Sequence, residues 1–325
     1  MPRIAYVDVL KGFAIIGIVL QHEGFDLITE NLYVPVFFMI SGYFFKEERM
    51  GVIIRKRFLS LIVPYLWFVF LFFMTKWLFY FLDCHNIIVS LKHAIYRANL
   101  FKCNIILHKS IWFLPVLFFI TIIYKVISNI KDESKIFMFV LMVYALGYLT
   151  GKYWHSQVIY LTDTVLSSMI YFYAGHLMKK YEQNADRGSW WIQLIPIMLW
   201  AVLTLMLNPA HSYKNNIFPL YLPMMVIPAI VSTFLLLKRM KLEGNLLTKP
   251  IQIAGIYSLG ILGYHALCNI VMDELKVGCI INTNMLPYFK FFVIVLIVPV
   301  LIWVTLRIFP RFVGKAKCDK DWVIS

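Results

Sequence analysis

Charged residues are scarce in this sequence. Only 15% of its 325 residues are Asp, Glu, Lys or Arg, whereas 61% are hydrophobic. Soluble domains carry about 25% charged residues, because a surface in water needs polar cover. The composition therefore excludes an ordinary soluble enzyme, a disordered chain and a disulfide-rich secreted scaffold. It predicts an all-α polytopic membrane protein.

Cysteine is also rare, and the five cysteines show no C-x-x-C spacing. Thiolate metal sites use such close pairs, so no metal cofactor is expected. Cys84 and Cys103 share one long loop between predicted membrane spans. They would form a disulfide if that loop faces an oxidising compartment, and they would stay free thiols otherwise.

Acidic residues are fewer than basic ones, 17 against 31, which gives a formal net charge of +14. In a soluble protein this excess would suggest a nucleic-acid partner. In a membrane protein, the distribution of the basic residues over the loops indicates which loops face the cytoplasm. We therefore expect membrane lipid, and no nucleic acid, around this chain.

Ten apolar segments approach the length of about 20 residues that a helix needs to cross a bilayer. They cover residues 4–21, 32–45, 58–82, 111–130, 136–153, 158–178, 190–207, 217–237, 251–272 and 286–309. The first is not a cleaved signal peptide, because Asp8 and Lys11 interrupt it and no A-x-A site follows. Without a repeat or soluble stretch, residues 1–325 are expected to form a single membrane domain with a short basic tail from about 310.

Loop charges predict the orientation of these spans. The first loop, 21–31, carries three acidic residues and no Lys or Arg, whereas the second carries five basic residues. Later even-numbered loops are also basic, and the long loop 83–110 is the main exception among the odd ones. Because positive loops stay in the cytoplasm and long loops follow the rule weakly, both termini are predicted to be cytoplasmic.

The first predicted helix contains ionisable residues where the bilayer makes them costly. Lys11 and His22 lie eleven residues apart, which places them on one helix face about 16 Å apart along the axis. Asp8 can pair with Lys11 at i,i+3, and Glu23 follows His22 and could orient or charge its ring.

These residues also allow other interpretations. Lys11 could simply snorkel to the membrane interface, and His22 could mark the outer helix end. The pair His22-Glu23 does not continue into a zinc motif, because Asp26 stands where HExxH needs its second His. A transporter or glycan flippase could use Asp8, Lys11 and His22 as a proton relay.

Several segments resemble acyltransferase family 3, the bacterial integral-membrane acyltransferases. That family opens with D-x-x-[KR]-G and a [RK]-x10-H spacing, which Asp8, Lys11, Gly12 and His22 match. The likeness continues in PVFFMISGYFF (35–45), RKRFLSLIVPYLWF (55–68), IWFLPVLFF (111–119) and YSLGILGYHALCN (257–269). It is closest to the branch that includes fucose 4-O-acetylase. One departure is Ser60, which stands where the family often has the second Arg of R-x-x-R after Arg57.

The resemblance implies transfer of an acyl group, usually acetyl, from acyl-CoA to a hydroxyl of a surface polysaccharide or lipid-linked sugar. It implies a multi-pass enzyme of the bacterial inner membrane with acetyl-CoA as co-substrate. His22 would be the catalytic residue, either as a general base or as the first acyl acceptor.

The resemblance also assigns expected roles around His22. Lys11, Arg55 and Arg57 would bind the acyl donor, since cationic side chains hold phosphates. A second set would line the site or contact the acceptor; it comprises Asp8, Glu23, Ser41, Trp112 and His265. A non-catalytic membrane sensor is a third interpretation, which the retained Lys11, His22 and Arg57 disfavour.

Overall fold

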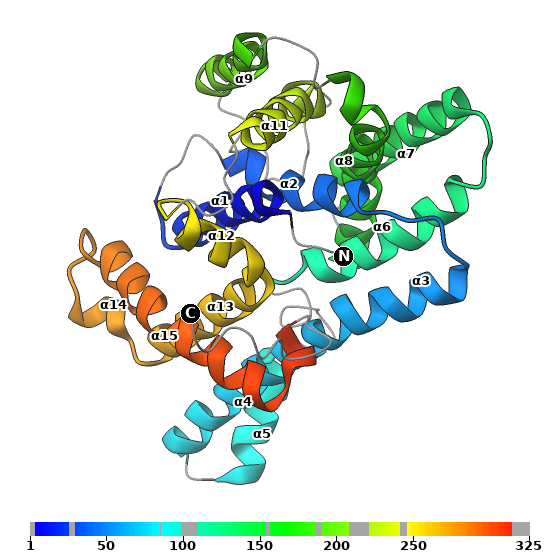
Figure 1. Cartoon of the computed structure of the whole chain (residues 1–325). Coiled ribbons are helices and arrows are strands. Elements are labelled where there is room, and N and C mark those ends of the chain that lie inside the picture. Colours follow the sequence, from blue (N-terminus) through cyan, green and yellow to red (C-terminus); the bar gives the residue numbers. More distant parts are fainter. Residues whose placement is uncertain are drawn as a thin grey trace. The chain divides into compact units, whose positions relative to one another are not determined.

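The computed structural model describes residues 4–25, 30–84, 86–98, 110–153, 157–185, 190–207, 221–240 and 246–313. Every regular element in these ranges is helical, as the composition predicts (Figure 1). The chain divides into two compact units, which we describe separately. Unit 1 comprises residues 1–22, 26–50 and 119–258, and unit 2 comprises 23–25, 51–118 and 259–325. The single membrane domain predicted for residues 1–325 stays a prediction.

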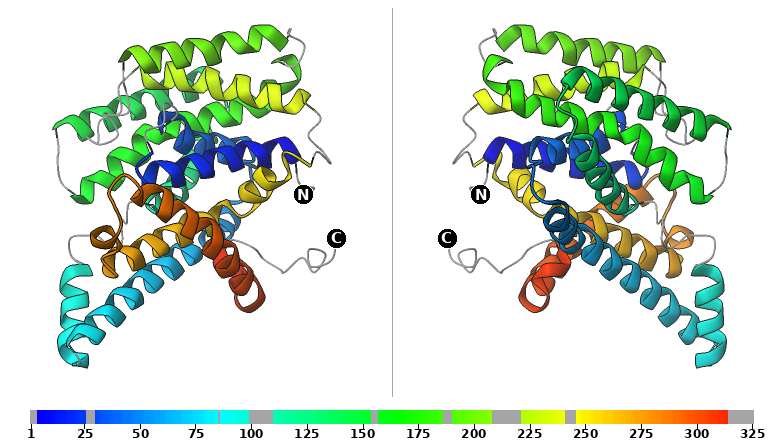
Figure 2. Two further views of the ribbon diagram at one scale, coloured as in Figure 1. Left: turned by 90° about the vertical axis from the view of Figure 1, so that its left-hand side faces the viewer. Right: turned by 90° about the vertical axis from the view of Figure 1, so that its right-hand side faces the viewer.

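Unit 1 is a bundle of helices far apart in sequence. Its elements are α1 (Ala5–His22), α2 (Glu30–Tyr43), most of α6 (Phe113–Ile127), α7 (Glu133–Tyr153), α8 (Gln157–Ala185), η3 (Trp190–Gln193), α9 (Leu194–Leu207), α11 (Leu222–Arg239) and α12 (Lys249–Ile256). Helix α1 packs on α12, and α8 packs on both α2 and α7. Helices α9 and α11 lie side by side (Figure 2).

Glycines allow the two closest helix contacts of unit 1. A Cβ on Gly12 of α1 would lie 1.9 Å from the Ile251 carbonyl oxygen, and one on Gly255 of α12 would lie 1.7 Å from that of Asp8. Gly42 and Gly175 make the same reciprocal contact between α2 and α8. Small residues of this kind let helix backbones meet in membranes. The glycines of the D-x-x-K-G and Ser-Gly motifs are therefore packing residues.

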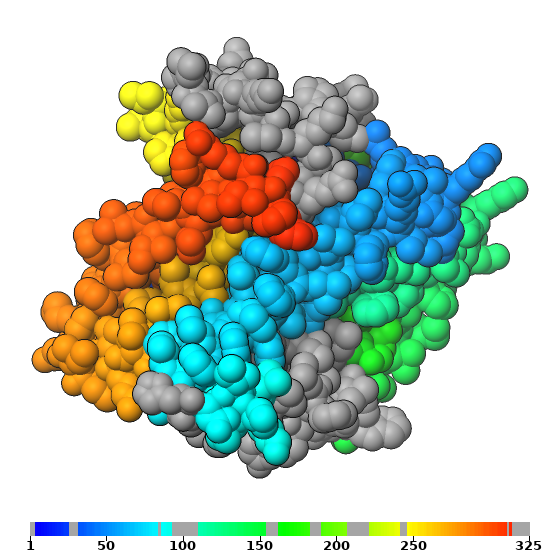
Figure 3. All heavy atoms as spheres, turned by 90° about the horizontal axis from the view of Figure 1, so that it is seen from below, coloured from blue at the N-terminus to red at the C-terminus, as the bar shows by residue number. Residues whose placement is uncertain are grey.

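Unit 2 contains α3 (Met50–Arg57), the π-helical turn η1 (Phe58–Ile62), α4 (Val63–Cys84), α5 (Ile87–Ala98), α13 (Ser258–Glu274), α14 (Val277–Ile280), α15 (Leu286–Ile308) and η4 (Pro310–Val313). Helix α4 packs on α5 and on η4. Trp67 of α4 stacks on Phe312 of η4 with ring centroids 4.5 Å apart. Figure 3 shows this face, where the end of the chain's described part lies on the α4 segment.

Each of the ten predicted spans coincides with a helix or helix pair, but not all of these helices are long and apolar enough to cross a bilayer alone. Five are: Ala5–His22, Met50–Asp83, Glu133–Tyr153, Leu222–Arg239 and Leu286–Ile308. The broken pair α12–α13 makes a sixth if it is one span. On α15 only 22% of the apolar window is buried in the protein, which leaves an apolar surface suited to lipid. The structure thus supports a multi-pass membrane protein, while ten spans and cytoplasmic termini stay predictions.

The long predicted loop 83–110 contains a helix that its composition had not indicated. Helix α5 places exposed apolar residues such as Ile87 and Ile88, which are 61% and 67% exposed, on its surface. An amphipathic helix of this kind can lie in the membrane interface. Cys103 lies outside the described residues, so the proposed Cys84–Cys103 disulfide stays a prediction.

Candidate functional site

The ion pair predicted in the first helix is present. Asp8 is 6% exposed, and its Oδ1 lies 2.6 Å from Nζ of Lys11, whose side chain is 23% exposed. The close contact between α1 and α12 buries the Asp8 backbone beneath Gly255. A buried carboxylate needs such a partner to stay ionised in apolar surroundings. The pair therefore fixes the Lys11 ammonium near the start of α1.

Helix α1 ends at His22, and the chain then turns sharply. His22 is the last helical residue and is exposed. Gly24 has φ +91°, a left-handed conformation that favours glycine and commonly ends helices. This turn carries Glu23 into unit 2, where the Glu23 residue is only 5% exposed.

In unit 2, Glu23 meets the middle of α13. Its Oε1 accepts a hydrogen bond from Nδ2 of Asn269 at 2.6 Å. Asn269 lies one turn beyond His265, a fully buried residue whose Nδ1 donates to the Ile261 carbonyl oxygen at 2.9 Å. Burial raises the pKa of Glu23, and the Asn269 bond and Lys290 only partly oppose this shift. The structure thus places Glu23 against α13, the helix that contains His265. Both residues were predicted from the sequence.

The remaining predicted residues are distributed over both units. Arg57 is half-buried at the end of α3, and Arg55 is exposed one turn before the π-helical turn η1. Ser41 is half-buried on α2, and Trp112 is half-buried in the turn before α6. Their functional roles stay predictions.

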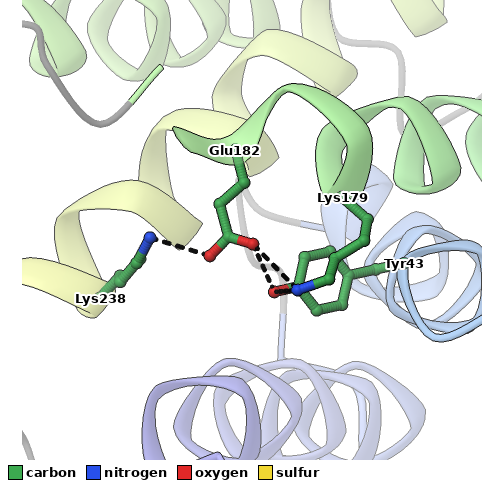
Figure 4. Close-up of polar contacts among 4 residues, drawn as sticks. All are labelled: Tyr43, Lys179, Glu182 and Lys238. Atoms are coloured by element: carbon green, nitrogen blue, oxygen red, sulfur yellow. Dashed lines mark hydrogen bonds and ion pairs between the residues drawn. The ribbon is translucent and has the colours of Figure 1, made fainter. Parts of the chain in front are cut away.

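Sequence reasoning missed a second buried carboxylate, Glu182 near the end of α8. Its Oε2 accepts a hydrogen bond from the Tyr43 hydroxyl at 2.8 Å and from Lys179 Nζ at 3.2 Å. Its Oε1 lies 2.9 Å from Nζ of Lys238 on α11. Figure 4 shows these four side chains converging from α2, α8 and α11. We call Tyr43, Lys179, Glu182 and Lys238 the Glu182 cluster.

The Glu182 cluster is a compensated charge site. Burial alone would raise the pKa of Glu182, but the hydrogen bonds from Lys238, Tyr43 and Lys179 outweigh burial and lower this pKa. Its members stand near the ends of α2, α8 and α11. The Glu–Lys spacing at 179 and 182 is visible in the sequence, but the partners on α2 and α11 are not.

Another missed acid is Asp163, which is 6% exposed in the predicted span 158–178. Its Oδ1 accepts bonds from the backbone N–H and the hydroxyl of Thr164, at 2.6 and 3.2 Å. Gly147 of α7 packs against this segment, where a Cβ would lie 2.6 Å from the Ser167 amide nitrogen. The polar stripe of α8 is therefore turned toward α7, which explains why α8 is buried despite its modest hydropathy.

Unit 1 also has a cavity of about 490 Å³ at the ends of α6, α7 and α8. Its lining includes Glu47, Lys131, Glu133, His176 and Lys180. Glu133 already accepts from Lys180 at 2.5 Å, so two acids offset the two lysines. In the described ranges, no group of three or more His, Cys, Asp or Glu side chains is arranged to hold a metal ion.

Comparison with known proteins gives one match. The family model for acyltransferase family 3, described as an acyltransferase domain, matches residues 4–304. No curated protein and no solved structure matches the chain. The matched range includes every residue that the sequence singled out for a site.

Proposed function

The chain belongs to acyltransferase family 3 and is a membrane acyltransferase, and on this premise we propose that it O-acetylates a cell-surface polysaccharide or a lipid-linked sugar. The proposed donor is acetyl-CoA, and the proposed location is the bacterial inner membrane. One observation carries the proposal: the matched range holds the Asp8–Lys11 ion pair and His22 on a single helix. The family match does not favour the alternative of a transporter.

We propose that His22 acts on the acceptor hydroxyl. A sugar hydroxyl is a poor nucleophile near neutral pH, so a base must take its proton as its oxygen attacks the thioester carbonyl. The coenzyme A thiolate then leaves and takes up that proton from the imidazolium. The exposed position of His22 at the end of α1 suits contact with a substrate. His22 would also allow a second scheme, in which it accepts the acyl group first and an acyl-histidine then passes it to the sugar.

We propose that the acyl donor, acetyl-CoA, is bound by basic residues on the predicted cytoplasmic side. Arg55 and Arg57 end α3, and α3 joins α4 through the π-helical turn η1. Such turns often occur at functional sites. Guanidinium groups suit the coenzyme A phosphates because they donate in a fixed fork. Lys11, held by Asp8, would meet the donor deeper in the membrane.

Ser41, Trp112 and His265 are proposed to line the site. Ser41 precedes Gly42, so the close α2–α8 contact fixes its position. His265 is fully buried, and its bond to Ile261 fixes the ring orientation. These residues would shape the site without taking part in proton transfer.

The proposal is tested by deleting the gene and complementing the deletion. Proton NMR of the surface glycans should lose O-acetyl methyl signals on deletion and regain them with the wild-type gene. Complementation with His22→Ala should leave the signals absent, whereas His93→Ala on α5 should restore them. Unchanged O-acetyl signals after deletion would show that the proposed reaction is wrong.

The donor assignment has its own test. Arg57→Ala should raise the KM for acetyl-CoA by about tenfold, which corresponds to about 1.4 kcal/mol, because one charge-assisted bond to phosphate is lost. Lys135→Ala is a matched control, because Lys135 is an exposed cation in the first turn of α7. An unchanged KM for acetyl-CoA in Arg57→Ala would remove Arg57 from the donor site.

A further inference from the structure

Two oxygen atoms beside the end of α1 are buried without a donor in the part of the chain that the structure describes. They are Oε2 of Glu23 and Oδ1 of Asn269. The other polar atoms of the two side chains already meet, since Asn269 Nδ2 donates to Glu23 Oε1. Buried polar atoms are almost always hydrogen-bonded, so an exception calls for an explanation. We call these two residues the Glu23–Asn269 pair.

Neighbouring charges restrict what could satisfy the Glu23–Asn269 pair. Lys290 of α15 is the nearby cation, but its Nζ lies 2.9 Å from Oδ1 of Asp273. A metal ion would need further ligands, and among the described residues no group of three or more His, Cys, Asp or Glu side chains is arranged to hold one. The carboxylate repels the phosphates of coenzyme A. Neutral hydroxyl donors are the chemistry that fits two acceptor oxygens.

The chain places this pair next to the proposed catalytic residue. Glu23 follows His22 directly, so their Cα atoms are about 3.8 Å apart. Beyond the Gly24 turn, the Phe25 ring lies edge-on to Tyr288 with centroids 5.2 Å apart. Tyr288 is 61% exposed and presents an aromatic surface in the same unit. Aromatic surfaces beside hydroxyl acceptors are the usual setting for a sugar ring, which has apolar faces and polar edges.

We propose that Glu23 Oε2 and Asn269 Oδ1 bind two hydroxyl groups of the acceptor saccharide. This inference rests on the proposed function and adds the acceptor subsite to it. The subsite binds the sugar before and during transfer, so its loss weakens acceptor binding. It has no part in binding the acyl donor or in activating water.

The test measures two reactions of the full-length protein in lipid nanodiscs. One is acetyl transfer from labelled acetyl-CoA to envelope glycans that were de-O-acetylated with mild alkali. The other is hydrolysis of acetyl-CoA without glycan, with water as the acceptor. Glu23→Gln and Asn269→Leu should each raise the KM for glycan by about tenfold or more, because a hydrogen bond to a desolvated group is lost. Hydrolysis should stay at the wild-type rate.

Glu274→Gln is the matched control, because it makes the same change on α13 about 140° around the helix from Asn269. It should leave both reactions unchanged. A wild-type KM for glycan in Glu23→Gln and Asn269→Leu would mean that only water occupies the site, and would overturn the subsite. Equal loss of transfer and hydrolysis would show a purely structural role and would also overturn it. Absence of transfer by the wild-type protein would instead overturn the proposed function and the subsite with it.

Discussion

Glu182 and Glu23 are both buried carboxylates near the end of a helix, but their surroundings are opposite. Glu182 is 8% exposed and receives Tyr43, Lys179 and Lys238, so both of its oxygens have partners. Glu23 is 5% exposed and receives one amide, and its second oxygen has no donor within the described ranges. The pKa of Glu182 is lowered and that of Glu23 is raised.

On the proposed acceptor subsite, this difference separates a structural charge from one kept for a substrate. A buried charge with full compensation ties elements together, and removing one partner is costly. A buried carboxylate with an oxygen that receives no hydrogen bond lowers stability. Such a group is kept where function needs it. The comparison predicts that changes at Glu182 affect stability first, whereas changes at Glu23 affect acceptor use first.

The largest expected effect on stability is that of Glu182→Ala. It leaves the Lys238 ammonium without its carboxylate in a half-buried position, which should cost about 3 kcal/mol of stability. Thermal unfolding in detergent measures this loss. The protein that remains folded should transfer acetyl groups with a normal KM for glycan. A changed KM at full stability would place the Glu182 cluster in the site and break the comparison.

The two lysines of the Glu182 cluster should differ in effect. The Lys238 side chain is 26% exposed and that of Lys179 is 56% exposed. Solvent screens the more exposed pair, so Lys179→Met should cost under about 1 kcal/mol and Lys238→Met about 1–2 kcal/mol. Thermal unfolding of the two variants side by side decides the order. Equal losses would mean that burial does not set the strength of these pairs.

Acid should act on the two carboxylates in opposite directions. The lowered pKa of Glu182 means that its stabilisation is present above the unfolded-state value of about 4.3 and is lost as pH falls through the folded value. Unfolding of Glu182→Gln should therefore show a smaller loss of Tm between pH 6 and pH 3 than the wild type. An identical pH profile in both proteins would argue against a compensated anion at this position.

Glu23→Gln is expected to gain stability, in contrast to the losses at the Glu182 cluster. The raised pKa of Glu23 means that ionisation lowers stability as pH rises through the folded value. The amide removes that cost, so the variant should be more stable at pH 7 by about 1 kcal/mol, with no gain at pH 4. Asp273 and Lys290 also shift the pKa of Glu23. The stability of Glu23→Gln against pH is therefore compared with that of Glu274→Gln, which makes the same chemical change at another position. A less stable variant at pH 7 would show that Glu23 is a structural anion.

The sequence predicted the helices better than their partners. Where the structure describes them, all ten apolar segments are mainly helical, because apolar runs and helix breakers are local signals. The Asp8–Lys11 pair was predictable for the same reason, since i,i+3 spacing sets it. The π-helical turn η1 and the helix α5 were not predicted, because packing and interface position decide them.

The partners of the buried acids depend on contacts between distant segments. Nothing local connects Glu23 with Asn269, or Glu182 with Tyr43 and Lys238. The sequence did not predict a buried acid at Asp163, because the apolar residues around it indicate only a membrane span. Its burial depends on how α8 packs against α7. The resemblance to acyltransferase family 3 was confirmed over residues 4–304, whereas the roles of the individual residues stay proposals.

The central claim, that His22 transfers an acyl group to a sugar hydroxyl, is tested most directly with purified protein in nanodiscs. The measurement is the rate at which label passes from acetyl-CoA to de-O-acetylated glycan in the wild type and in His22→Ala. Removing a general base typically costs about 10²–10⁴-fold, so His22→Ala should fall at least about 100-fold while keeping the wild-type Tm. Transfer by folded His22→Ala at the wild-type rate would contradict the account.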